Sequence, residues 1–385
     1  MHIAFVTSLY PSKSRPNYGT FVQQLVWEIA RQGAKCTVVA PNSLFELRYG
    51  HLDPKIQKER VDADAEVQVF RPRFISASTK QVWRYNTNEL SYRGFSHAAR
   101  SQLLRMAKYV DILYGHFLFP SGRFVASIGK ELGKPSFAAH GDDCIEGSDL
   151  KRGGQDFDNL TGIVAVSERN KKFCEMHLGF PSERIAVFPN GVNQHVFYPR
   201  DRDEMRRKYS LPLDKMLVAF AGHFIERKGP HRVLEAIKPL TDVGAVMMGT
   251  GPIRLETPQI VFKRSVPNSQ VAELLSACDI FVLPTLNEGC CNAVLEALSC
   301  AVPVVTSRGD FNDEIVDDNV AVRINPMNIE EIRSAIVALA SNPKLREEMS
   351  KRALSHSKRF SLEARAKGIL EWIQETIGAT QGGMR

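Results

Sequence analysis

Short apolar runs alternate with helical stripes of apolar residues along the first half of the chain. The run Ile3–Thr7 predicts a buried strand. Apolar residues at the spacing of one helix face follow it, namely Phe21, Val22, Leu25, Val26 and Ile29. Gly33 predicts the end of this helix. Later apolar runs predict further strands at Cys36–Ala40, Asp111–Tyr114, Ser136–Ala139, Gly162–Val166 and Ile185–Phe188.

The same alternation starts afresh in the second half. Its apolar runs are Met216–Ala221, Ala245–Met248, Ile260–Phe262, Asp279–Leu283 and Val302–Thr306, with helical patterns between them. Strands that alternate with helices form parallel sheets covered on both faces. We therefore predict an α/β fold of two doubly wound parallel-sheet domains that face a cleft. Prolines and a charged run indicate the linker between them within residues 190–215.

Ligands of open parallel sheets bind beyond the carboxyl ends of the strands. The loops that follow the predicted strands are therefore where chemistry is expected. Four of these loops carry polar or glycine-rich sequence: Tyr18–Thr20, His140–Asp143, Gly222–Gly229 and Glu288–Glu296.

The loop Glu288–Glu296 joins a buried strand to a helix. Asn292 can cap that helix, and the free amides of residues 290–292 would form an anion site suited to a diphosphate. Glu296, one turn into the helix, could accept hydrogen bonds from ribose hydroxyls, while Glu288 would lie on the sugar side. The alternative interpretation is a capped surface helix with two solvated acids.

Two cations precede the helix of the Gly222–Gly229 loop. Lys228 and Arg227 would there neutralise a departing nucleotide diphosphate without a metal ion. The alternative, surface cations at a helix start, is disfavoured because the helix dipole repels cations at that end.

His140, at the end of a predicted strand, could hydrogen-bond a substrate hydroxyl, although a single histidine is also compatible with a structural role. Gly249–Gly251 does not begin a dinucleotide motif, because Arg254 occupies the third glycine position.

The composition indicates a folded protein. The chain has 385 residues, of which 43% are hydrophobic and 24% charged. It contains no apolar run long enough to span a membrane, and its first residues enter a strand without a signal-peptide pattern. Seven cysteines without a C-x-x-C spacing argue against a disulfide scaffold and a zinc ribbon. These features predict a reduced, cytoplasmic protein.

The net charge of +7 is concentrated in one segment. Residues 71–110 hold eight cations, Arg71, Arg73, Lys80, Arg84, Arg93, Arg100, Arg105 and Lys108, against the single acid Glu89. Six aromatic residues are interleaved with them, Phe74, Trp83, Tyr85, Tyr92, Phe95 and Tyr109. This mixture suits an anionic membrane surface or an anionic ligand, and it can also serve nucleic acid. The alternative is a solvated basic helix whose aromatic residues face the core.

Taken together, these loops resemble glycosyltransferase family 4, the retaining enzymes of GT-B fold. The resemblance covers nearly the whole chain and rests on motifs in a fixed order: Gly19, Asp111–His116, Pro135–Asp142, Val166–Ser167, Phe188–Phe197, Gly222–Gly229, Gly249–Pro252, Glu288–Glu296 and Ala301–Val305. It implies an acceptor-side domain at residues 1–195 and a donor domain at residues 196–360. It also implies that the C-terminal helix, within residues 361–385, returns to the first domain.

The resemblance also implies roles for individual residues. Lys228, Glu288 and His140 are the catalytic candidates, with Lys228 on the donor diphosphate and His140 on the donor sugar. Donor-binding candidates are Gly19, His223, Arg227, Gly289, Cys290, Cys291, Asn292 and Glu296. The sequence departs from the family pattern where arginine is usual at His223, and Arg227 is the candidate to replace it. Tyr18 replaces the first glycine of a pair, and Arg264 stands in the loop that faces the nucleobase.

The function that follows is a retaining, metal-independent transfer of a hexose from a UDP-linked donor to a glycan or lipid-linked acceptor in cell-surface polysaccharide biosynthesis. No cofactor and no nucleic-acid partner are expected, and the basic segment would hold the enzyme at the inner face of the membrane. Among bacterial members, the chain resembles enzymes of teichuronic acid and exopolysaccharide synthesis. A sugar-nucleotide epimerase, a phosphorylase and a basic nucleic-acid-binding protein are the alternatives.

Overall fold

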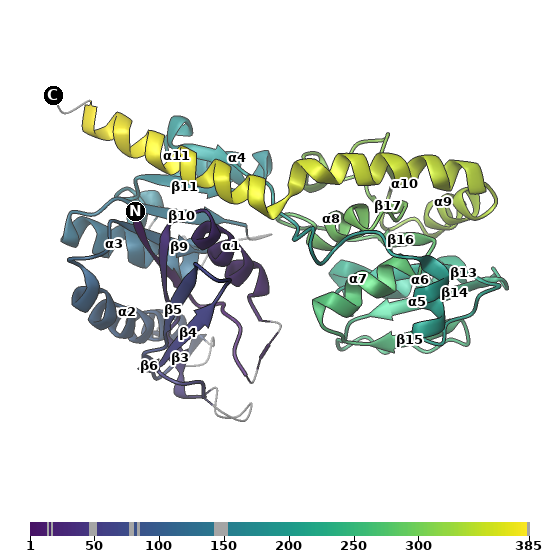
Figure 1. Cartoon of the computed structure of the whole chain (residues 1–385), viewed down its shortest axis with the longest axis horizontal. Coiled ribbons are helices and arrows are strands. Elements are labelled where there is room, and N and C mark those ends of the chain that lie inside the picture. Colours follow the sequence, from purple (N-terminus) through teal and green to yellow (C-terminus); the bar gives the residue numbers. More distant parts are fainter. Residues whose placement is uncertain are drawn as a thin grey trace. The chain divides into compact units, whose positions relative to one another are not determined.

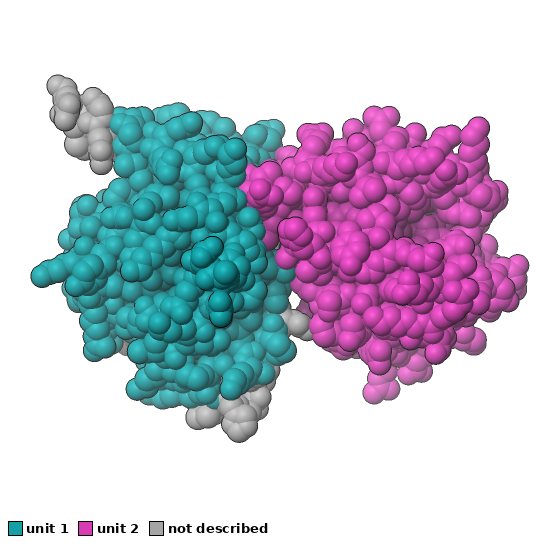
Figure 2. Space-filling view, in the orientation of Figure 1, with its two compact units in different colours: residues 1–188, 365–385 teal, residues 189–364 magenta. Residues whose placement is uncertain are grey.

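The computed structural model divides into two compact units, which Figure 2 colours separately. Unit 1 comprises residues 1–188 and 365–385, and unit 2 comprises residues 189–364. The structure describes residues 1–13, 15–16, 18–45, 52–76, 81–82, 85–141 and 153–382. The chain passes between the units after Phe188 and again after Ala364, close to the boundaries at residues 195 and 360 that the sequence indicates.

Unit 1 is built on an eight-stranded sheet of order β12-β11-β10-β9-β1-β2-β5-β4, in which only β4 runs antiparallel. The strands are β1 His2–Thr7, β2 Lys35–Val39, β4 Ile56–Arg60, β5 Glu66–Phe70, β9 Ile112–His116, β10 Ser136–His140, β11 Gly162–Ala165 and β12 Ile185–Val187. Two short pairs lie outside it, β3 Asn42–Ser43 with β6 Arg73–Phe74, and β7 Gln81–Val82 with β8 Tyr85–Asn86. The strand order reverses between β1 and β9, which is where ligands of such sheets bind.

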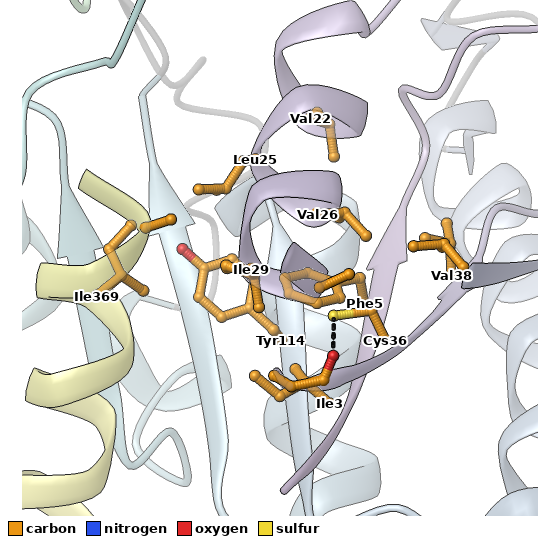
Figure 3. Close-up of a cluster of buried hydrophobic side chains, with 14 of the residues drawn as sticks. Ile3, Phe5, Val22, Leu25, Val26, Ile29, Cys36, Val38, Tyr114 and Ile369 are labelled. Carbon is orange, nitrogen blue, oxygen red and sulfur yellow. Dashed lines mark hydrogen bonds between the residues drawn. The ribbon is translucent and has the colours of Figure 1, made fainter. Parts of the chain in front are cut away.

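Helices cover both faces of this sheet (Figure 1). α1 Thr20–Arg31 and α11 Leu362–Gly382 pack on one face, and α2 Thr87–Met106, α3 Arg123–Leu132 and α4 Glu168–Leu178 pack on the other. In Figure 3, apolar side chains of α1 and Ile369 of α11 lie around Phe5 and Tyr114. The amphipathic face of α1 buries Val22, Leu25, Val26, Ile29 and Ala30 at helical spacing.

The C-terminal helix is part of the core of unit 1. Its buried residues in that core are Ala366, Ile369, Leu370 and Ile373. The ring of Trp372 makes an edge contact with Phe137, with centroids 5.5 Å apart. It also lies over Gly162, where a Cβ atom would come within 2.5 Å of the indole ring. Glycine at the start of β11 therefore allows α11 to pack closely on the sheet.

Unit 2 contains a six-stranded, wholly parallel sheet of order β15-β14-β13-β16-β17-β18. Its strands are β13 Met216–Ala221, β14 Val243–Met248, β15 Ile260–Arg264, β16 Ile280–Leu283, β17 Val304–Ser307 and β18 Ala321–Ile324. Its helices are α5 Arg202–Lys208, α6 Pro230–Ile237, α7 Asn268–Ser276, α8 Asn292–Ser299, α9 Ile329–Ala340 and α10 Pro343–Ser357. The strand order reverses between β13 and β16.

Two doubly wound parallel sheets confirm the fold class that the sequence predicts. The apolar runs become strands because both faces of each sheet are covered, so that every residue of β1 and β14 is buried. Residues 190–215 are not simply a linker: α5 forms within them and buries Met205 and Arg206 in unit 2.

Candidate active site

An ion-pair cluster lies at the reversal point of the unit 2 sheet. The Glu288 carboxylate, buried in the loop after β16, forms ion pairs with Lys228 Nζ and, at 3.3 Å, with Arg227. The hydroxyl of Thr285 donates to the same oxygen, Oε1 of Glu288, at 2.9 Å. Two cations and a hydroxyl therefore converge on one carboxylate oxygen, and the cluster as a whole keeps one excess positive charge.

The loops that carry this cluster are tied together by a buried arginine. Lys228 ends a short 3-10 turn, Glu226–Lys228, between β13 and α6. The guanidinium of Arg232 donates to the carbonyl oxygens of Glu226 (2.9 Å) and of Pro284 (3.0 Å), which belongs to the loop after β16. Gly229 lies against this guanidinium with a φ of +69°, and a Cβ atom there would come within 2.4 Å of it. Arg232 thus fixes the loops after β13 and β16 relative to each other.

The motif Gly249–Gly251 has a packing role at this edge. A Cβ atom at Gly249 would lie 1.9 Å from the carbonyl oxygen of Gly222, and one at Gly251 would lie 2.4 Å from that of Phe224. The Phe224 amide donates to the carbonyl oxygen of Thr250 at 2.9 Å. The two glycines let the loop after β14 support the loop after β13 at van der Waals distance.

Helix α8 begins in this loop, but Asn292 does not cap it. Cys291 occupies the capping position without a side-chain bond, and the Asn292 side chain instead accepts a hydrogen bond from Asn190 at 2.7 Å. The amide of Asn292 donates to Cys290, whereas the amides of Cys291 and Ala293 have no acceptor within the described part of the chain. The expected cap is therefore wrong, and these two amides remain as hydrogen-bond donors at the start of α8, where helices commonly bind anions.

Glu296 lies one turn into α8. Burial raises the pKa of its carboxyl to about 8, although the charge of Lys228 opposes this shift. Its carboxylate makes no hydrogen bond or ion pair with any residue in the described ranges. A desolvated carboxyl group of this kind is suited to accept hydrogen bonds from a ligand.

The structure distinguishes His223 from Arg227. His223 is exposed, and its side chain forms no hydrogen bond or ion pair with the rest of the described chain. Arg227 donates to the carbonyl oxygen of Asn287 at 2.6 Å in addition to its ion pair with Glu288. Of the two, only Arg227 is part of the ion-pair cluster.

Gly19 and His140 lie in unit 1, at the carboxyl edge of its sheet. Gly19 precedes α1 with a φ of +77°, and a Cβ atom there would lie 2.6 Å from the backbone of Leu9. Only glycine therefore lets α1 begin so close to the loop after β1.

His140 is buried at the end of β10. Its Nε2 is 3.0 Å from the side-chain amide nitrogen of Asn170, and Nδ1 is buried without a partner in the described residues. Burial lowers the pKa of His140 to about 4. On the neighbouring strand, His116 is also buried and its pKa is lowered to about 3, with the charge of Arg365 adding to the effect of burial. Both imidazoles are therefore neutral near pH 7.

The sequence did not indicate Asn170 as a candidate site residue. Its position three residues after Ser167, which caps a helix, was the available signal.

Part of the basic segment is structural. Arg71 is buried and donates to the carbonyl oxygen of Pro11 at 2.8 Å. The aromatic residues Phe74, Tyr92 and Phe95 pack against the core of unit 1. Arg71 therefore does not face a partner, and Phe74, Tyr92 and Phe95 follow the alternative interpretation, in which the aromatic residues of the segment face the core. Lys80, Trp83 and Arg84 lie outside the described residues.

The exposed part of this segment is the outward side of α2 and the turn that follows it. Arg93, Arg100, Arg105 and Lys108 are exposed there, together with the apolar Leu90, Leu104 and Tyr109. Arg93 pairs with Glu89, and Arg100 pairs with Glu131.

Comparison with protein families assigns the two halves of the chain separately. Residues 18–196 match the model "Glycosyltransferase Family 4", and residues 201–356 match "Glycosyl transferases group 1". The chain belongs to glycosyltransferase family 4. It is therefore a transferase, and the glycosyl-transfer expectation from the sequence is confirmed at this level.

Individual relatives of this glycosyltransferase agree. It is 28% identical, over 87% of its own length and 88% of the relative's, to a putative teichuronic acid biosynthesis glycosyltransferase, TuaC, of Bacillus subtilis. It is 23% identical to the D-inositol 3-phosphate glycosyltransferase of Acidothermus cellulolyticus, over 72% and 70% of the two chains.

Solved structures support the GT-B fold. Sucrose-phosphate synthase from Thermosynechococcus elongatus superposes with a TM-score of 0.76 at 16% identity, over 98% of this chain and 99% of that one. HepE from Anabaena, solved in complex with UDP, superposes with a TM-score of 0.73 at 15% identity, over 97% and 100% of the two chains. Within the described ranges, the glycosyltransferase has no helix that is both long and apolar enough to traverse a bilayer.

Proposed function

We propose that this glycosyltransferase moves a hexose from a UDP-linked donor to a glycan or lipid-linked acceptor, with retention of configuration and without a metal ion. The acceptor belongs to a cell-surface polysaccharide, in keeping with the name of the Bacillus subtilis relative. The observation that carries the proposal is the cluster of Lys228, Arg227 and Glu288 beside the outward amides of α8.

The cluster is suited to a diphosphate. When the donor binds, its phosphate oxygens compete with Glu288 for the two cations, and the amides of Cys291 and Ala293 add the partial positive charge of a helix N-terminus. These donors are fixed in place by Arg232 before the reaction, so they need little reorganisation as negative charge grows on the leaving diphosphate. Glu296 accepts the ribose hydroxyls. The nucleobase is taken to be uracil because the fold neighbour HepE binds UDP.

The departing phosphate is proposed as the base. The bond between the anomeric carbon and the phosphate oxygen breaks, and its electron pair stays on that oxygen. The acceptor hydroxyl oxygen bonds to the same face of the anomeric carbon, and its proton passes to the departing oxygen. Glu288 is a poor nucleophile for the alternative, a covalent intermediate, because Thr285, Lys228 and Arg227 already surround its Oε1. His140 holds a hydroxyl group of the donor sugar.

Thermal unfolding with a panel of nucleotide sugars identifies the donor, because a ligand that binds the native state raises the unfolding temperature. We expect UDP-sugars to stabilise the protein, and transfer to persist in EDTA. The anomeric configuration of the first product, read by NMR, tests retention. An inverted product, or activity that EDTA abolishes and Mg²⁺ restores, would contradict the mechanism. Product formed without any acceptor would favour an epimerase.

We further propose that the outward side of α2 brings the enzyme to the cytoplasmic face of the membrane. Exposed cations and apolar residues lie together there. Each cation near an anionic bilayer contributes about 1 kcal/mol to the binding free energy. Arg105 and Lys108 carry most of this attraction, because Arg93 and Arg100 are paired with acids.

Sedimentation with vesicles that contain anionic lipid tests this attachment. The charge-reversal variant Arg93→Glu, Arg105→Glu, Lys108→Glu should stay in the supernatant while the wild type sediments at low salt. The matched control reverses three exposed cations of α10, Lys344, Lys351 and Arg352. Sedimentation of neither protein, or of both equally, would contradict membrane attachment through α2.

A further inference from the structure

A chain of buried side-chain hydrogen bonds ends at His140. Ser167 caps α4, and its hydroxyl oxygen accepts from the backbone amide of Asn170 at 3.2 Å. The same hydroxyl is 2.5 Å from Oδ1 of Asn170. The Nδ2 of Asn170 is 3.0 Å from Nε2 of His140. All three side chains are at most 5% exposed.

The direction of this chain follows from the donors and acceptors available. A contact of 2.5 Å is typical of O–H···O and too short for N–H···O, so Ser167 donates to the carbonyl oxygen of the Asn170 side chain. The NH₂ group of that side chain then points to His140 and donates to Nε2. A neutral imidazole that accepts at Nε2 carries its proton on Nδ1.

The Nδ1–H of His140 is therefore a buried donor, and no acceptor for it lies among the described residues. It is located at the carboxyl edge of the sheet, directly before Gly141. A Cβ atom at Gly141 would lie 3.0 Å from the ring of Phe117 and 3.2 Å from Val166. A buried donor without an acceptor is unfavourable in the unliganded protein, and a ligand that brings an acceptor removes the penalty.

We propose that Asn170 and Ser167 are positioning residues that hold His140 as an Nδ1–H donor, so that it gives a hydrogen bond to a hydroxyl oxygen of the donor sugar and accepts none. The identity of the acceptor as the donor sugar rests on the proposed function. The tautomer rests only on the hydrogen-bond chain. His116 differs, because its side chain forms no hydrogen bond with the described residues and its ring lies against the rings of Phe21 and Phe117.

The tautomer is measurable without any ligand. Two-bond ¹⁵N–¹H NMR spectra distinguish Nδ1–H from Nε2–H imidazoles, and the loss of one signal set in His140→Gln assigns the residue. We expect His140 to be the Nδ1–H tautomer in the wild type. An Nε2–H signal would overturn the proposal.

Asn170→Asp reverses the hydrogen bond with almost no change in shape. A carboxylate only accepts, so it requires a proton on Nε2 of His140. The Nδ1–H tautomer should then disappear, and affinity for UDP-glucose should fall about 10- to 100-fold while affinity for UDP stays unchanged. Asn328→Asp is the matched control, since either residue can cap α9 there.

A second pair of variants remains informative if Asn170→Asp does not fold. Ser167→Thr keeps a hydroxyl that can cap α4 and orient the amide, whereas Ser167→Ala lets the amide turn over. We expect mixed tautomers and weaker UDP-glucose binding in Ser167→Ala only. Equal losses for UDP and UDP-glucose, or an unchanged tautomer in Asn170→Asp, would overturn the proposal. A wild type with the Nδ1–H tautomer that binds no nucleotide sugar would support the tautomer assignment and refute the proposed function instead.

Discussion

The donor loops of unit 2 gather charged side chains, whereas the strand ends of unit 1 bury neutral ones. In unit 2, Lys228 and Arg227 face Glu288, and all three reach the edge of the sheet from loops. In unit 1, His116 and His140 end neighbouring strands and have pKa values lowered to about 3 and about 4 by burial. Each region ends with polar atoms that the protein does not satisfy by itself.

Under the proposed function, the two regions would bind different parts of a nucleotide sugar, the diphosphate and the sugar. A diphosphate is anionic and gains charge as it leaves, so cations and backbone amides that are already in position suit it. A sugar is uncharged, and its hydroxyl groups are recognised by fixed donors and acceptors. A histidinium at the sugar would have to be desolvated, which burial at the strand end already prevents.

Removing a cation from the donor loops should have the largest effect. Lys228→Ala should lower kcat about 10²- to 10³-fold, because one stabiliser of developing charge is lost. Initial rates at saturating donor measure this. Lys238→Ala, at an exposed position that follows α6, is the matched control. A near-normal rate would remove Lys228 from the mechanism.

A second variant at Glu288 tests whether the defect of Lys228→Ala comes from the lost cation or from the charge of Glu288. In Lys228→Ala it is left with Arg227 as its remaining cation, so it also repels the phosphate. The double variant Lys228→Ala, Glu288→Gln should therefore regain affinity for UDP but not rate. If the double variant recovers kcat as well, the charge of Glu288 and not the loss of Lys228 causes the defect.

The buried, neutral histidines should make the stability of the protein fall at low pH. Their pKa values are lowered relative to ~6.5 in the unfolded chain, so the unfolded state binds more protons as pH falls below 6.5. Stability is therefore lost toward low pH, by about 2 kcal/mol per histidine at pH 5. Urea unfolding of His140→Gln should show a smaller decrease in stability between pH 6.5 and pH 5 than that of the wild type. Parallel curves for the two proteins would show that His140 is not buried as a neutral group.

The sequence predicts the sheets better than the contacts of the site. Strands such as β1 and β14 are apolar throughout and could be recognised without knowledge of their partners. The edge strand β4, Ile56–Arg60, is polar and only partly buried, so its apolar pattern is too weak to identify. The edge strands β12 and β15 were predicted because they contain apolar runs, whereas the interior strand β5 alternates polar and apolar residues and was missed. The apolar run, and not the place in the sheet, therefore makes a strand recognisable from sequence.

The candidate site residues could be predicted because they lie in loops after strands, but the residues that they contact could not. The ion pair between Lys228 and Glu288 joins loops that are sixty residues apart, and no local spacing encodes it. Arg71 was expected at the surface because arginine is rarely buried, yet it lies inside, where it donates to the carbonyl oxygen of Pro11 and its guanidinium lies over the ring of Tyr10. Asn292 was expected to cap α8, yet it is held by Asn190 from a distant segment.

The raised pKa of Glu296 in unit 2 should make the affinity for UDP depend on pH. Burial raises its pKa to about 8, so it is mostly protonated at pH 7 in the free enzyme. If ribose hydroxyls donate to the ionised form, affinity for UDP should rise about tenfold from pH 7 to pH 9, as the competent fraction grows. Calorimetric titration at several pH values measures it, with Glu235→Gln as the exposed control.

Glu296→Gln should give a flat profile over this range. Its stability should also change with pH in a defined direction. The raised pKa means that the folded wild type binds more protons than the unfolded chain between about pH 4.5 and pH 8, so the wild type loses stability as pH rises through this window. The glutamine variant should lack that loss. A pH-dependent affinity that survives in Glu296→Gln would assign the titration to another group.

The smallest predicted effect decides which side chain replaces the usual arginine at the diphosphate. Arg227 is partly exposed, so its contribution is discounted for solvent, and Arg227→Ala should lower kcat/KM about fivefold. His223→Ala should have no effect, because His223 is exposed and outside the cluster. A larger loss in His223→Ala than in Arg227→Ala would contradict the assignment and extend the charged region to the opposite end of the loop. Equal and negligible losses of kcat/KM in the two variants would show that neither side chain binds the diphosphate. Lys228 and the amides of α8 would then be its remaining ligands in unit 2.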